Sequence, residues 1–406
     1  MKMGVDCKVR AKAENIMLTV DTASTRQDLR EFIDIPSKLY ADILGFQPPL
    51  AADRAMLLDP KQSAFCKRGT ARYWIARANG KAVGRISAQF SQYIPVGVEP
   101  KSGMFGCLDA IDDAEVLAAL IAKAGQWLAA QGFEKMFGPC SLDMNDEPGM
   151  LIAGADQPAM TMCPWHPPYL AGHMEKLGFA KLHDLHNWRL DLTRRPPAPQ
   201  SARHRLANRV PSLTVRHPTR KTYARDIEIL CQVYNDGWQD NWGFVPLAPE
   251  DLAGLDQLMM WMVPREAFKI VEINGEPVGV MLLVPNLFEL TQGLGPRPGP
   301  LGWTKLLWRA ATHRFRSGRI IVTGVRHRLR GTMVGAAIAA LLVDELVAGH
   351  SALKGEWVEA GWVLEDNRAL IQILERYQFT RNKTFRIYNR ALATAPSPED
   401  TKELAA

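Results

Sequence analysis

The sequence predicts a mixed α/β protein that contains two copies of one fold in tandem. Two pairs of similar segments support this prediction, because they occur in the same order. Residues 73–90 resemble residues 268–285, at an offset of 195 positions. Residues 173–192 resemble residues 373–392, at an offset of 200 positions. Similar segments at a nearly constant offset are the sequence signature of a repeated structural unit.

In the first copy, residues 73–90 are expected to form a β-hairpin closed by Asn79 and Gly80. An Asn-Gly pair between two strand-like segments is typical of a two-residue hairpin turn. A strand, a helix and a strand are expected next, at residues 103–110, 114–132 and 135–140. The copy is expected to end within residues 173–192 with the last turns of a helix and a pair of strands.

The second copy is expected to follow the same order. Its hairpin, residues 268–285, turns at Asn274 and Gly275. A strand, a helix and a strand are expected at 319–325, 332–350 and 355–364, and the closing helix and strand pair at 373–392. Because strands come first and a strand–helix–strand unit follows, each half is predicted to be mixed α/β.

These blocks suggest domain boundaries. Residues 1–22 are predicted to be an N-terminal tail, 23–193 the first domain and 210–393 the second domain. The linker is expected at 194–209, which is rich in proline and charge, and residues 394–406 are expected to form a C-terminal tail.

Composition is that of a globular protein with reduced thiols. The 406 residues allow two domains, and 47% are hydrophobic. The first residues lack the apolar segment of a secretory signal, and the longest apolar run, 334–343, reaches about half a membrane span. The six cysteines form no Cys-x-x-Cys pair. We therefore expect a cytoplasmic protein without a metal site or a transmembrane helix.

The positive charge is concentrated in one segment. The chain has a net charge of +6, yet no acidic residue lies between Glu289 and Asp344. The nine basic residues in that interval leave a net charge of −3 for the rest of the chain. Such a segment predicts an anionic partner, which can be a phosphate group, an acidic membrane surface or a nucleic acid.

The loop after residue 325 lies where a strand is expected to run into a helix. The first N–H groups of a helix lack partners within the helix, and the helix dipole adds positive potential there. Gly331 allows a ligand to approach closely, while Arg328 and Arg330 add charged donors. The residues alone leave two interpretations open, a phosphate-binding loop or a basic turn before a buried helix.

The order of segments around this loop resembles that of the GNAT acyltransferase superfamily. The order is a strand, the Arg-x-x-Gly loop, a helix, a second strand and then residues 365–379. In that family the loop binds the pyrophosphate of coenzyme A. The resemblance implies that the donor-binding residues are Val325, Arg328, Arg330, Gly331, Thr332, Met333, Val334, Gly335 and Asn367.

Two positions depart from the family pattern. Met333 replaces a small residue of the loop, and Leu374 stands where many members have a tyrosine as general acid. The first copy lacks the loop altogether and has Asp112 and Asp113 there, which would repel phosphate. Only the second copy is therefore expected to bind the donor, with the first serving as a scaffold or binding the acceptor.

A finer resemblance covers most of the chain. Residues 137–154, 166–179, 234–247 and 361–367 are similar to the GNAT-type proteins that include bacterial ceramide synthase. Members of that family transfer a fatty acyl group from acyl-CoA to the amine of a sphingoid base. The resemblance implies long-chain acyl-CoA as a co-substrate, no permanently bound cofactor, and a sphingoid base such as sphinganine or 3-oxosphinganine as the acceptor.

N-acylation requires the amine in its neutral form, so a base near the acyl group would help. In the GNAT geometry the thioester lies between two diverging central strands, and Glu359 is on the second of them. We expect Glu359 to act as general base through a water molecule. The alternative, a structural carboxylate paired with an arginine, remains open.

Aromatic and amide side chains are expected to bind the acceptor, because an aromatic ring with a polar edge suits a lipid with a polar head. The alternative is that these side chains form an aromatic core in which the amide groups are hydrogen-bonded within the protein. The expected walls are Tyr234, Asn235, Trp238, Asn241 and Trp242 on one side, and Asn145, Glu147, His166 and Tyr169 on the other.

Residues 299–319 are expected to include a basic amphipathic helix. Trp303, Leu306, Leu307 and Ala310 can share one face of it. Such a helix can lie in the interface of an anionic inner membrane as a peripheral contact, or pack on the sheet as an insertion. Residues 255–264, with three methionines, are a candidate lipid entrance.

Two other functions remain open. A Fem-type aminoacyltransferase also doubles the GNAT fold but takes its donor from tRNA, and a non-catalytic GNAT-like protein would bind lipid only. The Arg-x-x-Gly loop suits coenzyme A, and the basic residues are not interleaved with aromatic residues as in a base-stacking surface. We therefore expect no nucleic-acid partner.

Overall fold

The structure is a computed structural model that describes residues 17–194, 210, 212–252, 265–348 and 355–392. Most of the linker predicted at 194–209, the candidate lipid entrance at 255–264 and the tail predicted at 394–406 lie outside the described residues. Within the tail predicted at 1–22, residues 18–22 form a strand, so the ordered part of the first half begins earlier than expected.

The first half consists of a strand, three helices, a strand-rich centre and a final long strand. Its elements are β1 (Leu18–Thr22), α1 (Arg26–Leu39), α2 (Ala51–Leu58), α3 (Ala64–Arg68), β2 (Gly69–Ala78), β3 (Lys81–Ser91), β4 (Ser102–Ala110), α4 (Ala114–Ala130), β5 (Lys135–Gly138), β6 (Met150–Ala153), α5 (Tyr169–Lys176) and β7 (Ala180–Asp191).

The second half repeats the main order with an addition before β11 and, in its described residues, without counterparts of α2, α3 and β6. Its elements are β8 (Leu213–Arg216), α7 (Tyr223–Trp238), β9 (Phe268–Ile273), β10 (Glu276–Pro285), α9 (Phe288–Thr291), α10 (Pro300–Thr312), β11 (Ser317–Val325), α11 (Met333–Ala348), β12 (Trp357–Leu364), α12 (Arg368–Arg376) and β13 (Thr380–Ala391). Single 3₁₀ turns lie at Pro249–Asp251, Arg265–Ala267 and His327–Leu329.

Both predicted hairpins are confirmed. Asn79 and Gly80 have φ of +49° and +80°, and Asn274 and Gly275 have φ of +51° and +78°. Positive φ at both central residues is the geometry that matches the twist of the flanking strands, and Asn-Gly adopts it at low cost. The predicted strand–helix–strand units are confirmed as well, as β4–α4–β5 and β11–α11–β12.

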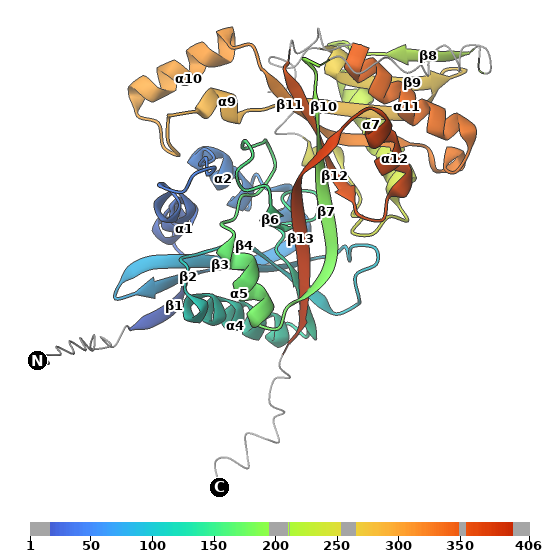
Figure 1. Ribbon diagram of the computed structural model, residues 1–406. Helices are drawn as coiled ribbons and strands as arrows, with labels where there is room; N and C mark the ends of the chain where they lie inside the picture. The colour runs from blue at the N-terminus through green and yellow to red at the C-terminus, as the bar shows by residue number, and fades with distance from the viewer. Residues whose placement is uncertain (1–16, 195–209, 211, 253–264, 349–354, 393–406) are drawn as a thin grey trace, which may run out of the picture.

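The predicted closing strand pair is wrong in both halves, because each half ends with one strand of 12 residues, β7 or β13. These two strands are exchanged in the sheet. The strand order is β1-β2-β3-β4-β5-β13-β7-β12-β11-β10-β9-β8. Thus β13 pairs with β5 of the first half, and β7 pairs with β12 of the second half. The halves therefore share one continuous sheet of 13 strands (Figure 1).

Polar groups fix the register where β7 and β13 meet. Arg386 on β13 lies opposite Asp184 on β7, and its guanidinium donates to both carboxylate oxygens at 2.8 and 3.0 Å. A bidentate Arg–carboxylate pair is among the stronger polar contacts in proteins. It keeps the pKa of Asp184 below its usual value, although burial alone would raise it.

Helices cover the sheet with separate apolar clusters in the two halves. Leu117 and Leu120 of α4 pack on strands of the first half, and Leu341 and Leu342 of α11 pack on strands of the second half. α7 packs on the opposite face of the second half through Leu230 and its neighbours. In the described part of the chain, none of the helices combines the length and the apolar character needed to cross a membrane.

Because β13 completes the first half, we predict that its removal unfolds both halves. A chain ending at Phe379 should express as insoluble protein or lack a cooperative thermal transition, since β5 and β7 both lose the strand that lies between them. A chain ending at Leu392 retains every described strand and should melt in a single transition. Circular dichroism during heating measures both. A stably folded first half in the shorter chain would contradict the shared sheet.

Candidate active site

The parallel strands β11 and β12 pair only as far as Ile320 and Ala360 and then diverge. A cavity of about 110 Å³ lies in this opening, which we call the β11–β12 cavity. Its walls are mostly apolar. They include Ile321, Thr323, Ala339, Val343, Val363, Leu364, Leu370 and Leu374.

Four of the predicted acceptor residues line this cavity together. They are Tyr234, Trp238, Trp242 and Asn145. Tyr234 stacks on Trp238 with ring centroids 5.4 Å apart, and the Trp238 indole donates to the Thr323 carbonyl at 2.7 Å. Burial raises the pKa of Tyr234, so its hydroxyl stays protonated. The structure thus brings one wall from each half together, because Asn145 belongs to the first half.

Asn235 and Asn241 have different surroundings. The Asn235 side chain donates to and accepts from the backbone of Leu247, at 2.9 and 2.8 Å, so it fixes a loop and does not line the cavity. Asn241 accepts a hydrogen bond from Arg330 at 2.8 Å. This contact joins the aromatic segment to the basic loop.

The basic loop runs into α11 through a turn with an open backbone. Gly331 has φ of +71° and open space around it, and the Thr332 hydroxyl accepts from the Gly335 N–H at 3.0 Å at the start of α11. A side chain at Gly335 would collide with the Leu329 carbonyl, which explains the glycine. Met333 is 73% exposed, so its bulk points away from the turn. Val325 and Val334 pack against the core, so only their backbone can face a ligand.

The arginines of the loop are exposed and held by surface ion pairs. Arg328 pairs with Glu276 at 2.7 Å, and Arg330 lies 3.6 Å from Asp240. Both guanidinium groups remain about half exposed. Surface ion pairs of this kind contribute little free energy, so an incoming phosphate can displace them. Asn367, expected to contact the donor, caps α12 by accepting from the Leu370 N–H at 3.2 Å.

The first half lacks such a loop, as expected. Asp113 caps α4 and accepts from the N–H groups of Glu115 and Val116 at 2.8 and 3.3 Å. Asp112 lies 2.7 Å from the His173 ring. A carboxylate therefore already occupies the helix N-terminus where a phosphate would bind.

Glu359 does not have the surroundings of a general base. Its side chain is fully buried on β12, whereas Ala360 lines the β11–β12 cavity. Its carboxylate accepts from Asn187 at 2.5 Å, Asn382 at 2.8 Å and Lys383 at 3.1 Å. Burial raises its pKa, but Lys383, the Asn382 hydrogen bond and Arg319 outweigh burial and leave the pKa lowered. We correct the expected role to a structural one, with a lysine as the partner instead of an arginine.

A second cavity, of about 370 Å³, lies where the halves meet, between α2, α3, residues 141–147 and α9. We call it the acidic cavity because its lining includes Asp53, Asp146, Glu147, Glu250 and Asp251. The rest of its lining combines polar side chains, among them Arg54, with apolar ones. The apolar side chains include Leu50, Met56, Leu57, Phe65, Met162, Leu287 and Phe288.

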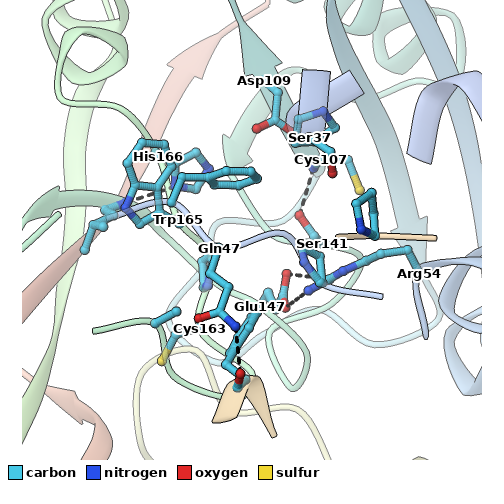
Figure 2. A pocket seen from close by; sticks show the side chains of 18 of the residues that line it. Ser37, Gln47, Arg54, Cys107, Asp109, Ser141, Glu147, Cys163, Trp165 and His166 are labelled. Atoms are coloured by element: carbon cyan, nitrogen blue, oxygen red, sulfur yellow. Dashed lines mark hydrogen bonds and ion pairs between the residues drawn. The ribbon is translucent and has the colours of Figure 1, made fainter. Parts of the chain in front are cut away.

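A deeper cavity of about 90 Å³ adjoins it and shares Arg54, Ser141, Glu147 and Phe288 with it. Figure 2 shows Arg54, Ser141 and Glu147 in this deeper cavity. Arg54 and Glu147 meet in a bidentate pair at 2.8 and 2.6 Å. His166 also lines this deeper cavity. Its Nδ1 accepts from the Leu151 N–H at 3.2 Å, and burial lowers its pKa, so the ring is neutral.

The predicted acceptor residues of the first half are therefore not all in one place. Asn145 lines the β11–β12 cavity. Glu147 lines both the acidic cavity and the deeper cavity, whereas His166 lines the deeper cavity only. Tyr169 lines none of the three and donates to the Ala110 carbonyl at 2.7 Å, a structural contact.

Asp146 is a candidate that the sequence analysis missed. Its neighbours Asp143 and Glu147 are paired with Arg68 and Arg54, whereas Asp146 accepts only from the Leu142 N–H at 3.4 Å in the described structure. Burial and the nearby Asp143 raise the pKa of Asp146 to about 8. The sequence contained a signal in the run of acidic residues from 143 to 147, but gave no means of telling which one lacks an arginine.

Among the residues that the structure describes, no three His, Cys, Asp or Glu side chains are placed to bind a metal ion.

Comparison with known proteins identifies relatives along nearly the whole chain. The chain is 36% identical over 381 residues to Protein YghO of Escherichia coli, covering 92% of this chain and 95% of that protein. It is 32% identical over 380 residues to the bacterial ceramide synthase of Caulobacter vibrioides, covering 93% and 98%. No protein-family model matches the chain.

Solved structures show the same fold at low sequence identity. A tandem GNAT protein from the clavulanic acid biosynthesis pathway superposes with a TM-score of 0.53 at 13% identity, covering 93% of this chain and all of that chain. A GCN5-related glucosamine N-acetyltransferase region of a fungal β-N-acetylglucosaminidase gives 0.55 at 14% identity, covering 94% and 39%. The predicted tandem GNAT fold is thus confirmed.

From its structural role, we predict that Glu359→Gln destabilises the protein by about 3–5 kcal/mol, because it leaves the Lys383 ammonium buried without a counter-charge. The lowered pKa means that the pair contributes stability above the ordinary glutamate pKa of 4.5 and loses it as pH falls through the folded-state value. Urea unfolding at neutral and acidic pH measures this. The double variant with Lys383→Met should recover part of the loss. Wild-type stability of Glu359→Gln at neutral pH would refute the structural role.

Proposed function

The chain belongs to the bacterial ceramide synthase family of GNAT-fold acyltransferases, and on this premise we propose that it transfers a long-chain fatty acyl group from acyl-CoA to the amine of a sphingoid base. Sphinganine and 3-oxosphinganine are the proposed acceptors. Acyl-CoA enters as a co-substrate, with no permanently bound cofactor. The observation that carries the proposal is the β11–β12 cavity, which has a basic loop beside it and residues of both halves in its walls.

The donor side is supported by charge and shape. The N-terminus of α11 with Arg328 and Arg330 suits a pyrophosphate. The apolar walls of the β11–β12 cavity suit the thioester and the start of an acyl chain. Leu374 in this wall carries no proton donor, but a thiol has a pKa near 8.5, so the departing thiolate needs little assistance. Tyr234, with its protonated hydroxyl in the same cavity, is the proposed proton donor to the sulfur.

The acceptor side is supported by the acidic cavity. A sphingoid base carries a cationic amine on a long apolar chain, and the cavity combines carboxylates with apolar walls. Residues 141–148 separate the two cavities. Met144 and Asn145 line one side of this segment, while Asp146 and Glu147 line the other. An amine bound among these carboxylates lies next to the wall of the acyl cavity.

In the proposed step, residues 141–148 move so that the two cavities join, Asp146 accepts a proton from the ammonium group, and the neutral amine attacks the thioester carbonyl carbon. The C–N bond forms and the C–S bond breaks. The nitrogen then loses its second proton, which passes by way of Tyr234 to the thiolate, giving an amide and free coenzyme A. An aspartate with a pKa of about 8 is closer to the pKa of an alkyl ammonium, near 10, than an ordinary carboxylate is.

Both lipid substrates partition into bilayers, because each buried CH₂ contributes about 0.8 kcal/mol. The proposed function therefore implies work at the cytoplasmic face of the inner membrane, through a peripheral contact.

The direct test is an assay of purified protein with palmitoyl-CoA and sphinganine. Thiol release together with an amide product of the expected mass would support the proposal. Thiol release with other amines but not with long-chain bases would reject the acceptor. A product only with aminoacyl-tRNA would favour the Fem-type reaction, and lipid binding without any product would favour the non-catalytic alternative.

We predict that Arg328→Ala with Arg330→Ala raises the KM for acyl-CoA by on the order of tenfold or more, because each charge-assisted hydrogen bond to phosphate is lost. The fold should be unaffected, since both side chains are half exposed. Initial rates at varied acyl-CoA measure this. Arg26→Ala with Arg30→Ala, which removes two exposed arginines from α1, is the matched control. An unchanged KM would contradict the assignment of the loop.

We predict that Asp146→Asn lowers kcat by about 10²-fold or more, the usual contribution of a general base. Because the base acts when ionised, wild-type kcat should rise with pH up to about 8 and then level off. The variant should lose this dependence, and Asp146→Glu should retain part of it. Glu250→Gln, an exposed acid of the same cavity, is the control. Wild-type kcat in Asp146→Asn would show that another group takes the proton.

A further inference from the structure

α10 is a helix of 13 residues with no buried side chain. The expectation that it packs on the sheet as an insertion is therefore wrong. α10 lies against α9 and projects from the body of the protein, apart from the sheet (Figure 1).

Its outward side is apolar. The exposed fractions are 86% for Leu301, 43% for Trp303, 67% for Leu307 and 66% for Trp308. Large aliphatic and indole side chains exposed in a row are unusual on a soluble surface and mark interaction sites. Trp303 and Leu307 of the expected apolar face are among these exposed side chains, whereas Leu306 of that face is half-buried, so the expected face is confirmed only in part.

Contacts on the other side hold the helix in this orientation. The Arg309 guanidinium donates to the carbonyls of Leu290 and Gln292 at 2.7 and 2.8 Å. At the end of the helix, the His313 ring lies 2.8 Å from the Glu289 carboxylate, which also accepts from the Ser317 N–H at 2.8 Å. The apolar row is therefore presented by a fixed helix.

The charged side chains of the segment around this row are basic, although Arg316 lies 4.0 Å from the Glu356 carboxylate and Arg297 pairs with Asp34. Lys305, Arg314 and Arg316 are exposed on and just after α10. No acidic residue occurs in the sequence from 290 to 343, and Glu289 is engaged as described. Exposed tryptophans and leucines beside basic side chains suit an anionic bilayer, where the rings lie at the headgroup level.

The first half provides an internal comparison. Its β3 and β4 are joined by residues 92–101, whereas the equivalent β10 and β11 are joined by residues 286–316, which include α9 and α10. The shorter connection is sufficient to join the strands. α10 is therefore not needed to form the sheet and has another role.

We propose that α10 is the surface that docks this protein on an anionic lipid bilayer, with Leu301, Trp303, Leu307 and Trp308 in the interface and the basic side chains on lipid phosphates. A second copy of the chain fits the exposed face of α10 less well than a bilayer does. A helix of 13 residues is about 20 Å long and 10 Å wide, or about 200 Å², while a stable dimer needs about 800 Å² from each partner. Self-pairing would also bring like charges together.

Docking through α10 also gives the acidic cavity a position near the lipid. α9, on which α10 packs, contributes Phe288 and Thr291 to the wall of that cavity, opposite Met56 and Leu57 of α2. A long-chain amine can then pass from the bilayer toward the carboxylates. This last step rests on the proposed function, whereas docking itself does not.

Co-sedimentation with vesicles of phosphatidylcholine and phosphatidylglycerol, without substrate, tests the docking. The wild type should bind, and Leu307→Ser with Trp308→Ser should reduce the partition coefficient at least tenfold. Lys305→Glu with Arg314→Glu should abolish the preference for phosphatidylglycerol. Ile94→Ser, which changes an exposed apolar residue in the equivalent connection of the first half, is the matched control and should bind as the wild type does.

Equal binding by the wild type and the Leu307→Ser, Trp308→Ser variant would overturn the proposal, as would no binding by the wild type. A change of the protein's own sedimentation coefficient in that variant would instead identify α10 as a protein interface. Turnover on a short-chain, water-soluble amine separates the two proposals. The α10 variants should turn over this soluble amine as the wild type does. If the wild type itself does not turn it over, that result would count against the proposed function and leave the docking proposal unaffected.

Discussion

The exchange of β7 and β13 is the constraint on which the rest of the structure depends. Each half supplies the last strand of the other. Because the central order is β5-β13-β7-β12, the sheet is continuous from one half to the other. Glu359 on β12 connects the three central strands at once, because it accepts from Asn187 on β7 and from Lys383 on β13. This buried carboxylate stabilises the junction, and its pairing excludes it from proton transfer at the cavity.

A shared sheet also fixes the two halves relative to each other, and the cavities depend on that. Asn145 of the first half lies in a cavity formed between strands of the second half. The acidic cavity has walls from α2 and α3 on one side and α9 on the other. The copies have diverged at the helix that follows the fourth strand of the fold. A basic turn precedes α11, and Asp113 caps α4. One copy can thus receive an anionic donor, while the other contributes carboxylates.

The parts of this structure that depend on local chemistry could be predicted from the sequence. Asn79-Gly80 and Asn274-Gly275 predicted hairpins, and the structure contains both. The pairing of β7 and β13 could not be predicted, because two long strands of similar sequence reveal nothing about which partner each will take. The sequence left a structural role of Glu359 open, but its partners could not be predicted for the same reason, since Asn187 is 172 positions away in the chain. Asn235 and Tyr169 looked equally suited to a substrate, and only their bonds to Leu247 and Ala110 show otherwise.

The central claim is that one donor site exists and that it lies between β11 and β12. Photolabelling with an acyl-CoA that carries a diazirine near the thioester, followed by peptide mapping, tests it most directly. The account predicts labels on peptides that include residues 320–325, 360–374 or 234–242, all of which are protected by excess unlabelled acyl-CoA. Protected labels on residues 103–110 or 138–142, the equivalent strand ends of the first half, would contradict it.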